Sequence, residues 1–239
     1  MLIFISLSGN PLSIKNELGS FSKTLNYRYS SSIHSMYAHY FMNETKISRE
    51  DLENIRKSLF HLKVDVLLVD KLLDRNLNSL FAFDMDSTLI KEEVIDEIAR
   101  KKGVYERVAA VTREAMEGNL DFDSALRKRC SYLDGLSENI FQEIFERITP
   151  NDGVEQVLPL IQKEKGIIAI FSGGFLPVIE KFSKNFSVNL FSANELEIEN
   201  GFTTGKVVGR IVNKNRKREL LIQHRDENKI LVSQTVAVG

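Results

Sequence analysis

Two aspartates stand two residues apart, directly after an apolar segment. Leu80 to Phe83 has the length and composition of a buried strand, and Asp84 and Asp86 follow it. Ligands of open parallel sheets bind at the carboxyl edge of the strands, so such a strand would bring both carboxylates to a binding edge. The alternative is that Asp84 and Asp86 merely end the strand and cap the next helix.

The spacing of the two aspartates indicates a particular chemistry. Neighbouring carboxylates repel each other and raise each other's pKa unless a cation lies between them. Mg²⁺ accepts such a pair and keeps water or phosphate oxygens as its other ligands. One carboxylate could then attack phosphorus to form an aspartyl-phosphate, while the other handles the proton of the leaving group.

Two further segments could hold an anion. Ile170 to Phe175 predicts a second buried strand that ends in a small-residue turn at Ser172 and Gly173, before a helix. A hydroxyl and successive backbone N–H groups at a helix N-terminus can bind an anion, although a plain turn is the alternative. The basic run from Lys214 to Arg218 opens a later helix, and such a run is usually a solvated face.

The elements that must position these residues follow an α/β order. After Leu80–Phe83, the next buried strand is Ile167–Phe171, and the roughly eighty residues between them far exceed one crossover helix. We therefore expect an insertion with helical periodicity, a cap over about residues 91–149. The glycines that punctuate it as helix ends are Gly103, Gly118 and Gly135.

The rest of this region alternates strands and helices, as in a doubly wound parallel sheet. The pattern predicts a helix over Phe175–Phe186, a hairpin over Glu195–Gly209 that turns at Asn200-Gly201, a helix over Lys217–Asn228 and a buried strand from Thr235 to Val238. On the predicted cap helices, Met116 and Phe122 would by default be core residues and Arg129 a surface residue.

The first part of the chain has a different predicted order of strands and helices. Residues 1–76 read as strand, helix, strand, strand, helix, strand, which predicts a small α+β domain with helices on one face of an antiparallel sheet. The turn-forming residues from Asp74 to Ser79 are the expected linker. We thus expect two domains, over residues 1–76 and 77–239.

The amino-acid composition limits the classes of protein to which this chain could belong. The 239 residues are 43% hydrophobic and 27% charged, which is typical of a globular chain, and 32 Lys and Arg balance 33 Asp and Glu to a net charge of −1. This balance gives no general attraction to nucleic acid or anionic lipid. The apolar runs are too short to span a membrane, and the single cysteine, Cys130, fits a reducing compartment such as the cytoplasm.

Taken together, the motifs resemble the haloacid dehalogenase superfamily of phosphotransfer enzymes, and within it the phosphoserine phosphatase family. The matching segments are Asp84-Met-Asp-Ser-Thr-Leu, Glu93 with Ile95-Asp-Glu-Ile98, Glu114-Ala-Met-Glu-Gly118, Leu126-Arg-Lys-Arg129, Ile148-Thr-Pro150 and Ser172-Gly-Gly-Phe175. The resemblance covers about Leu80 to Gly239. It implies a haloacid dehalogenase-like hydrolase fold with a helical cap, preceded by a domain that resembles the ACT fold in element order only.

The resemblance also implies a reaction: Mg²⁺-dependent hydrolysis of O-phospho-L-serine to L-serine and phosphate, the last step of serine biosynthesis. Asp84 would be the nucleophile and a Mg²⁺ ligand. Asp86 would be the general acid and base, with its backbone carbonyl also facing the metal.

The remaining site residues would bind the substrate. Ser172, Gly173 and Lys217 would hold the phosphate oxygens. In the cap, Arg129 would bind the substrate carboxylate and Glu93 its ammonium group, because a planar guanidinium suits a carboxylate. Met116 and Phe122 would close the pocket.

The sequence departs from the family pattern in one place. The family's last motif, Gly-Asp-Gly-x-Asn-Asp, supplies a further Mg²⁺ carboxylate, whereas here Thr235-Val-Ala-Val-Gly239 reproduces only the strand and the first Gly. We therefore expect a phosphatase domain that is incomplete at its C-terminus, with an exposed apolar edge. The sequence is then a fragment, a shortened reading frame or the product of a damaged gene, and if it is the whole product we expect little or no turnover.

Three questions stay open at this point. The motifs alone allow phosphate transfer to another small hydroxyl compound, and a catalytically silent ligand-binding or assembly subunit is the alternative from another class. The first domain could serve only in packing or dimerisation. The oligomeric state, a homodimer included, is not determined.

Overall fold

The structure is a computed structural model, and it describes the chain except for residues 7–9, 24, 34–35, 44–45 and 70–71. The chain forms two compact units, Met1–Leu72 and Leu73–Gly239. In the described part of the chain, no helix has both the length and the apolar character needed to cross a membrane.

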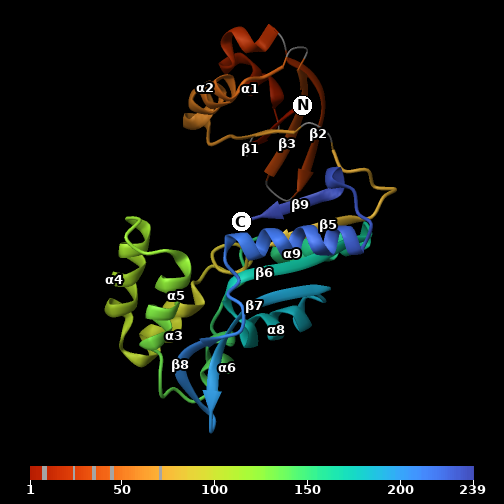
Figure 1. Cartoon of the computed structure of the whole chain (residues 1–239). Helices are drawn as coiled ribbons and strands as arrows, with labels where there is room; N and C mark the ends of the chain where they lie inside the picture. The colour runs from red at the N-terminus through yellow and green to blue at the C-terminus, as the bar shows by residue number, and fades with distance from the viewer. Residues whose placement is uncertain (7–9, 24, 34–35, 44–45, 70–71) are drawn as a thin grey trace. The chain divides into compact units, whose positions relative to one another are not determined.

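The first unit is an antiparallel sheet with helices on one face (Figure 1). Its elements are β1 (Leu2–Ser6), α1 (Pro11–Glu17), a 3-10 turn (Gly19–Lys23), β2 (Leu25–Ile33), β3 (Met36–Asn43), α2 (Arg49–Leu59), a second 3-10 turn (Phe60–Leu62) and β4 (Asp65–Leu68). The strands lie in the order β2-β3-β1-β4, the order of a βαββαβ sandwich. The element order is the one expected for this segment.

Both helices of this unit begin at residues that cap the helix N-terminus. Asn10 caps α1 with its side-chain oxygen, and Pro11 occupies the first helical position, where its missing N–H costs nothing. Ser48 and Asp51 form a reciprocal capping box at the start of α2. The helices then bury Ile14 and Ile55 against the sheet.

The second unit is an α/β sheet of strand order β8-β7-β6-β5-β9, in which β9, β5, β6 and β7 run parallel and β8 is antiparallel. Its strands are β5 (Ser79–Phe83), β6 (Gly166–Phe175), β7 (Leu190–Glu199), β8 (Phe202–Val208) and β9 (Thr235–Val238). Its helices are α3 (Val94–Lys102), α4 (Tyr105–Met116), α5 (Phe122–Ser131), α6 (Ile140–Phe145), α7 (Val154–Lys163), α8 (Leu176–Asn185) and α9 (Lys214–Glu227), with a 3-10 turn over Val232–Gln234.

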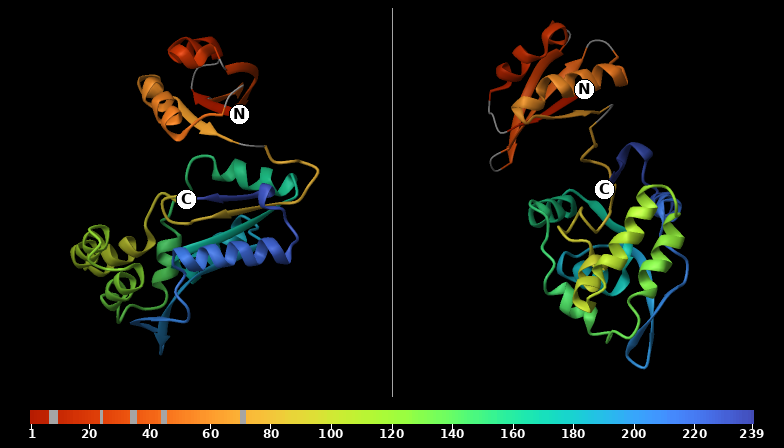
Figure 2. Two further views of the ribbon diagram at one scale, coloured as in Figure 1. Left: turned by 45° about the horizontal axis from the view of Figure 1, so that its top comes forward. Right: turned by 90° about the vertical axis from the view of Figure 1, so that its left-hand side faces the viewer.

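Alternate residues of the inner strands point to two separate cores, because successive side chains of a strand face opposite sides. Phe83 and Ile170 join the core beneath α7 and α8, whereas Ala82 and Phe171 join the core beneath α9. The opposed helices are visible in Figure 2. The expected doubly wound sheet is confirmed.

The insertion between β5 and β6 forms the helical cap. Helices α3, α4 and α5 pack on one another beside the carboxyl edge of the sheet (Figure 1), and α5 also contacts β8. Helix α6 packs against α3 and α8 and so ties the cap to the sheet region. Gly103 ends α3 at a φ of 79°, a backbone conformation that side-chain-bearing residues rarely adopt.

The stretch expected to link the two domains, Asp74 to Ser79, is bound to the second unit. The Asp74 N–H donates to Oε1 of Gln234 (3.0 Å), and Nε2 of Gln234 donates to the Asp74 carbonyl (2.8 Å). Arg75 forms an ion pair with Glu164. These bonds, and the strand that starts at Ser79, explain why the compact units divide before this stretch.

Two predicted strands differ from the structure. The small-residue turn expected at Ser172 is instead a continuation of β6, which stays extended to Phe175 and carries an irregularity in its pairing with β7. The strand from Thr235 to Val238 was expected to be buried, but β9 is an edge strand, and Val238 is 39% exposed. As expected for such an edge, an apolar hollow lies beside it, lined by residues that include Phe81, Phe83, Val157, Leu160, Val236 and Val238.

Candidate active site

Asp84 and Asp86 lie in a tight loop at the carboxyl end of β5. The Asp84 N–H donates to the Val238 carbonyl of β9 (2.9 Å), and Oδ1 of Asp84 accepts the N–H of Met85 (2.8 Å). Met85 is fully buried, and its carbonyl accepts the N–H groups of residues 88 to 90. The buried Met85 therefore anchors a loop that presents the two flanking carboxylates to the sheet edge.

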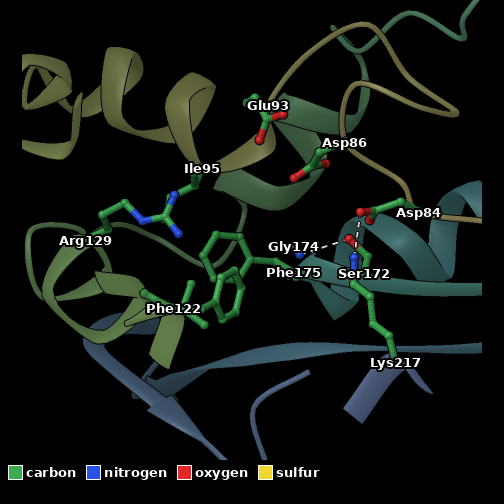
Figure 3. A pocket seen from close by; sticks show the side chains of 12 residues that line it. Asp84, Asp86, Glu93, Ile95, Phe122, Arg129, Ser172, Gly174, Phe175 and Lys217 are labelled. Carbon is green, nitrogen blue, oxygen red and sulfur yellow. Dashed lines mark hydrogen bonds and ion pairs between the residues drawn. The ribbon is translucent and has the colours of Figure 1, made fainter. Parts of the chain in front are cut away.

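Helix α9 brings a lysine to this edge. Asn213 caps the helix by accepting the N–H of Arg216 (3.0 Å), which fixes the first turn that carries Lys217. Nζ of Lys217 donates to Oδ2 of Asp84 over 2.6 Å (Figure 3). A cation thus lies beside the carboxylate that the sequence predicted as the nucleophile.

The end of β6 forms the opposite wall. Ser172 is fully buried, and its Oγ accepts the N–H of Gly174 (2.9 Å). A side chain at Gly174 would place Cβ 3.1 Å from Oδ2 of Asp86, so the glycine lets the backbone approach that carboxylate closely. The Ser172 hydroxyl retains its own hydrogen and can still donate to a ligand oxygen.

The cap contributes a carboxylate, a guanidinium and an aromatic ring to the same pocket. Glu93 precedes α3 and accepts a hydrogen bond from Oγ of Ser87 (2.7 Å). Nε of Arg129, on α5, is buried and has no hydrogen-bond partner among the described residues. Phe122 packs on Gly173 so closely that a Cβ there would lie 2.9 Å from Cζ of the ring.

Burial and like charges dominate the electrostatics at Asp86. Burial, followed by the nearby charges of Glu93 and Asp84, raises the pKa of Asp86 to about 7. A hydrogen bond from the Val94 N–H and the charge of Lys217 act in the opposite direction. A carboxyl group with such a pKa can hold or release a proton near neutral pH, which is what a general acid and base requires.

One pocket brings together almost all the residues that the sequence predicted. It is lined by Asp84, Asp86, Glu93, Ile95, Phe122, Leu126, Arg129, Ser172, Gly173, Gly174, Phe175 and Lys217. Asp84, Asp86 and Lys217 lie on the sheet side, whereas Glu93 and Arg129 lie on the cap side (Figure 3). The acidic and basic groups thus face a common space from both layers.

Met116 is the exception and corrects the prediction. It is the last residue of α4, it is 84% exposed, and it is not part of the pocket lining. The apolar wall comes instead from Ile95, Leu126 and Phe175, which were not among the predicted site residues. Ile95 and Leu126 occupy the apolar positions of the two cap motifs, and that periodicity was the available signal.

The oxygen atoms at the loop suit a hard divalent cation. Within the described residues, no group of three or more His, Cys, Asp or Glu side chains is placed to hold a metal ion. Asp84 and Asp86 nevertheless lie together, and Oδ1 of Asp86 is buried without a hydrogen-bond partner in the described structure. Mg²⁺ binds through one or two carboxylates and keeps substrate oxygens and water, so this donor set fits it.

A parallel α/β sheet that presents an aspartate pair at its carboxyl edge beneath a helical cap defines a class of hydrolases. The chain belongs to this class, the haloacid dehalogenase-like hydrolase family, whose sequence model matches residues 81–239. The predicted superfamily and fold are thereby confirmed.

The proteins that are similar to this chain include phosphoserine phosphatases. Phosphoserine phosphatases of Streptococcus thermophilus and Methanocaldococcus jannaschii are each 39% identical over 160 residues, which cover 67% of this chain and 74% and 76% of the relatives. A probable phosphoserine phosphatase structure from Vibrio cholerae is 28% identical and matches with a TM-score of 0.80 over 100% of this chain and 72% of its own. A substrate-bound phosphoserine phosphatase structure is 38% identical, with a TM-score of 0.64 over 68% of this chain and 78% of its own. The chain is thus similar to phosphoserine phosphatases, as predicted.

Proposed function

We propose that this chain hydrolyses O-phospho-L-serine to L-serine and phosphate, with Asp84 as the nucleophile. One observation carries the proposal. The pocket holds an aspartate–lysine pair on the sheet side and a separate carboxylate and guanidinium on the cap side. This arrangement provides one region for a phosphate group and another for a zwitterionic amino acid.

The cap residues would select the amino acid. Arg129 would bind the substrate carboxylate with its planar fork, which fits its buried Nε without a partner in the described structure. Glu93, held by Ser87, would bind the ammonium group. Phe122 packs against Gly173 and would exclude water from the pocket between the sheet residues and the cap residues.

The sheet residues would carry out the transfer. A carboxylate oxygen of Asp84 attacks phosphorus, the bond from phosphorus to the serine oxygen breaks, and Asp86 donates its proton to that oxygen. Water then attacks the aspartyl-phosphate, Asp86 takes up a proton from it, and phosphate leaves with Asp84 restored. The transition state of phosphoryl transfer is loose and its charge spread out, so Ser172, the Gly173 N–H and Lys217 would act mainly by positioning and charge.

Asp84 and the backbone carbonyl of Asp86 would hold Mg²⁺. When bound, such an ion would neutralise negative charge on the phosphate oxygens. We also propose that the reaction is the last step of serine biosynthesis and takes place in the cytoplasm. The unit formed by Met1–Leu72 would be an ACT-like packing or dimerisation module.

A phosphate-release assay with O-phospho-L-serine tests the proposal. The expected result is slow but magnesium-dependent release, slow because the motif that supplies a further Mg²⁺ carboxylate is not among these residues. Chelation and Asp84→Asn should abolish the release, with D152N as the control because Asp152 is exposed and lies outside the pocket. Binding of L-serine without any phosphate release would favour a silent binding subunit. Transfer to an added alcohol that exceeds release to water would favour a phosphotransferase.

A further inference from the structure

Asn194 is a buried polar residue that does not line the pocket but is hydrogen-bonded to one residue of its lining and to the segment before the helix that carries another. It lies on β7, paired with Phe175 of β6, and is 2% exposed. Its Nδ2 donates to the Gly173 carbonyl (2.8 Å), and its Oδ1 accepts the N–H of Val212 (2.8 Å). One side-chain amide thus joins the end of β6 to the segment before α9.

The first bond replaces backbone pairing that the sheet lacks at this point. Strands β6 and β7 pair at Phe171 with Ser192 and resume at Phe175 with Asn194, so an irregularity lies between. Residues 172–174 of β6 take no part in the described pairing with β7. A buried backbone carbonyl needs a hydrogen-bond donor, and Asn194 supplies one for Gly173.

This bond fixes the peptide group next to the one whose N–H, that of Gly173, would bind phosphate. The carbonyl of the Gly173–Gly174 peptide is held by Asn194, and its N–H donates to Oγ of Ser172 (2.9 Å). Rotation of that peptide would break both bonds. The orientation of the Ser172 hydroxyl and of the Gly173 backbone therefore depends on Asn194, although Asn194 is outside the pocket.

The second bond acts on the lysine side. Val212 precedes Asn213, the residue that caps α9, and Lys217 follows in the first turn of that helix. Nδ2 of Asn213 also donates to Oδ1 of Asp123 on the cap helix α5 (2.9 Å). The segment that Asn194 holds therefore starts the lysine helix and touches the cap.

We infer that Asn194 is a positioning residue that sets the spacing between the Ser172–Gly173 wall and Lys217, so that both sides contact the same phosphate group. The inference rests on the proposed function, in which those groups bind phosphate. Asn194 itself does not touch the substrate. The hydrogen bonds of Asn194 do not involve Glu93 or Arg129, the groups of the cap that would bind serine.

The test separates the two halves of the pocket. Titration calorimetry in magnesium chloride would measure the affinity of the whole chain for inorganic phosphate and, separately, for L-serine. For Asn194→Ala we expect the phosphate affinity to fall by about 10- to 100-fold, as for other residues that orient ligands indirectly. The affinity for L-serine should stay within about twofold, because Glu93 and Arg129 form no hydrogen bond with Asn194, Val212 or Asn213 in the described structure.

Asn189→Ala is the matched control. Asn189 likewise forms a side-chain hydrogen bond to the backbone of β6, in which it accepts the N–H of Ile168 (2.8 Å), but this bond lies at the other end of the strand and outside the pocket. Both affinities should be unchanged in N189A. Should N194A not fold, Asn194→Ser is the second variant, because a hydroxyl can replace one of the two hydrogen bonds. Its phosphate affinity should be lower than that of the wild type but still measurable.

Unchanged phosphate affinity in folded N194A or N194S would overturn the inference, and so would a parallel loss of both affinities, which indicates a merely structural role. The proposed function is judged separately, by phosphate release from phosphoserine in the wild type. A wild type that binds phosphate but releases none would contradict that function, while the phosphate affinities of the variants would still decide the role of Asn194.

Discussion

Lys217 and Asp84 form an ion pair of 2.6 Å, although they come from helix α9 and the end of strand β5. The two side chains are about one-third exposed, at 29% and 34%. Their contact puts the positive charge of Lys217 close to Asp84 and Asp86, whose negative charges would otherwise repel each other without compensation. The same ammonium group is placed to contact a phosphate group that approaches Asp84.

Replacing Lys217 tests this arrangement. Lys217→Met should reduce phosphoserine turnover by about 100- to 1,000-fold, since removing one preorganised donor from a transition state has effects of that size. The measurement is steady-state kinetics with phosphate detection. Lys214→Met is the control, because Lys214 lies at the exposed start of the same helix and does not line the pocket. Equal losses in both variants would contradict the assignment.

The raised pKa of Asp86 predicts a pH-dependent stability. Its value of about 7 in the folded protein lies above the ordinary value of 3.8, so the folded state holds a proton that the unfolded state releases. This contribution to the free energy of unfolding is complete below about pH 4 and is lost as the pH rises to about 7, by at most about 4 kcal/mol.

Asp86→Asn should remove that pH dependence. Without magnesium, the variant should be more stable than the wild type at pH 7, and the difference should shrink towards pH 4, as measured by urea unfolding at each pH. The same variant should lose phosphoserine turnover, because an amide cannot exchange the proton. Parallel stability curves of the two proteins would disprove the expected shift.

Arg129 should act on the amino acid and not on the phosphate. Arg129→Lys should raise the KM for phosphoserine by about tenfold or more, because an ammonium group cannot bind a carboxylate with a planar fork. Hydrolysis of p-nitrophenyl phosphate, which has no carboxylate, should change little. Arg113→Lys, at an exposed position on α4, is the control. A similar loss with both substrates would contradict a role in specificity.

The contact between Gly173 and Phe122 predicts a coupled pair. Gly173→Ala places a Cβ 2.9 Å from the ring of Phe122, so it should displace the cap aromatic and lower kcat/KM for phosphoserine. Phe122→Ala leaves room for that methyl group, and the double variant should therefore lose less than the sum of the two single losses. Strict additivity in this double-mutant cycle would show that the contact is unimportant.

Several features could be predicted because their signals are local. An apolar strand followed by Asp84 and Asp86, the small residues after the next buried strand and the helical periodicity of the insertion each depend on residues close in sequence. The same applies to the hairpin turn at Asn200 and Gly201, where both residues adopt positive φ angles of 52° and 82°. These signals were enough to predict the sheet and the cap, and the family resemblance that they support implied the charged residues of the pocket, whereas Ile95, Leu126 and Phe175 were not assigned to it.

Other features depend on contacts between distant segments. The turn expected at the end of β6 is instead an extended strand, because pairing with β7 resumes at Phe175 and the amide of Asn194 donates to the Gly173 carbonyl in the unpaired stretch before it. Met116 is exposed because α4 ends away from the pocket, which helical periodicity alone does not reveal.

By itself, the sequence determined which side chains could take part in the chemistry and on which type of element each would lie. The tertiary structure alone decided that Lys217 reaches Asp84, that Phe122 closes on Gly173 and that Asn194 joins the two anion-binding walls. The physical reason is that residue type and periodicity act over one or two turns of chain. The distance between two side chains on different elements follows from the packing of the whole sheet and its cap.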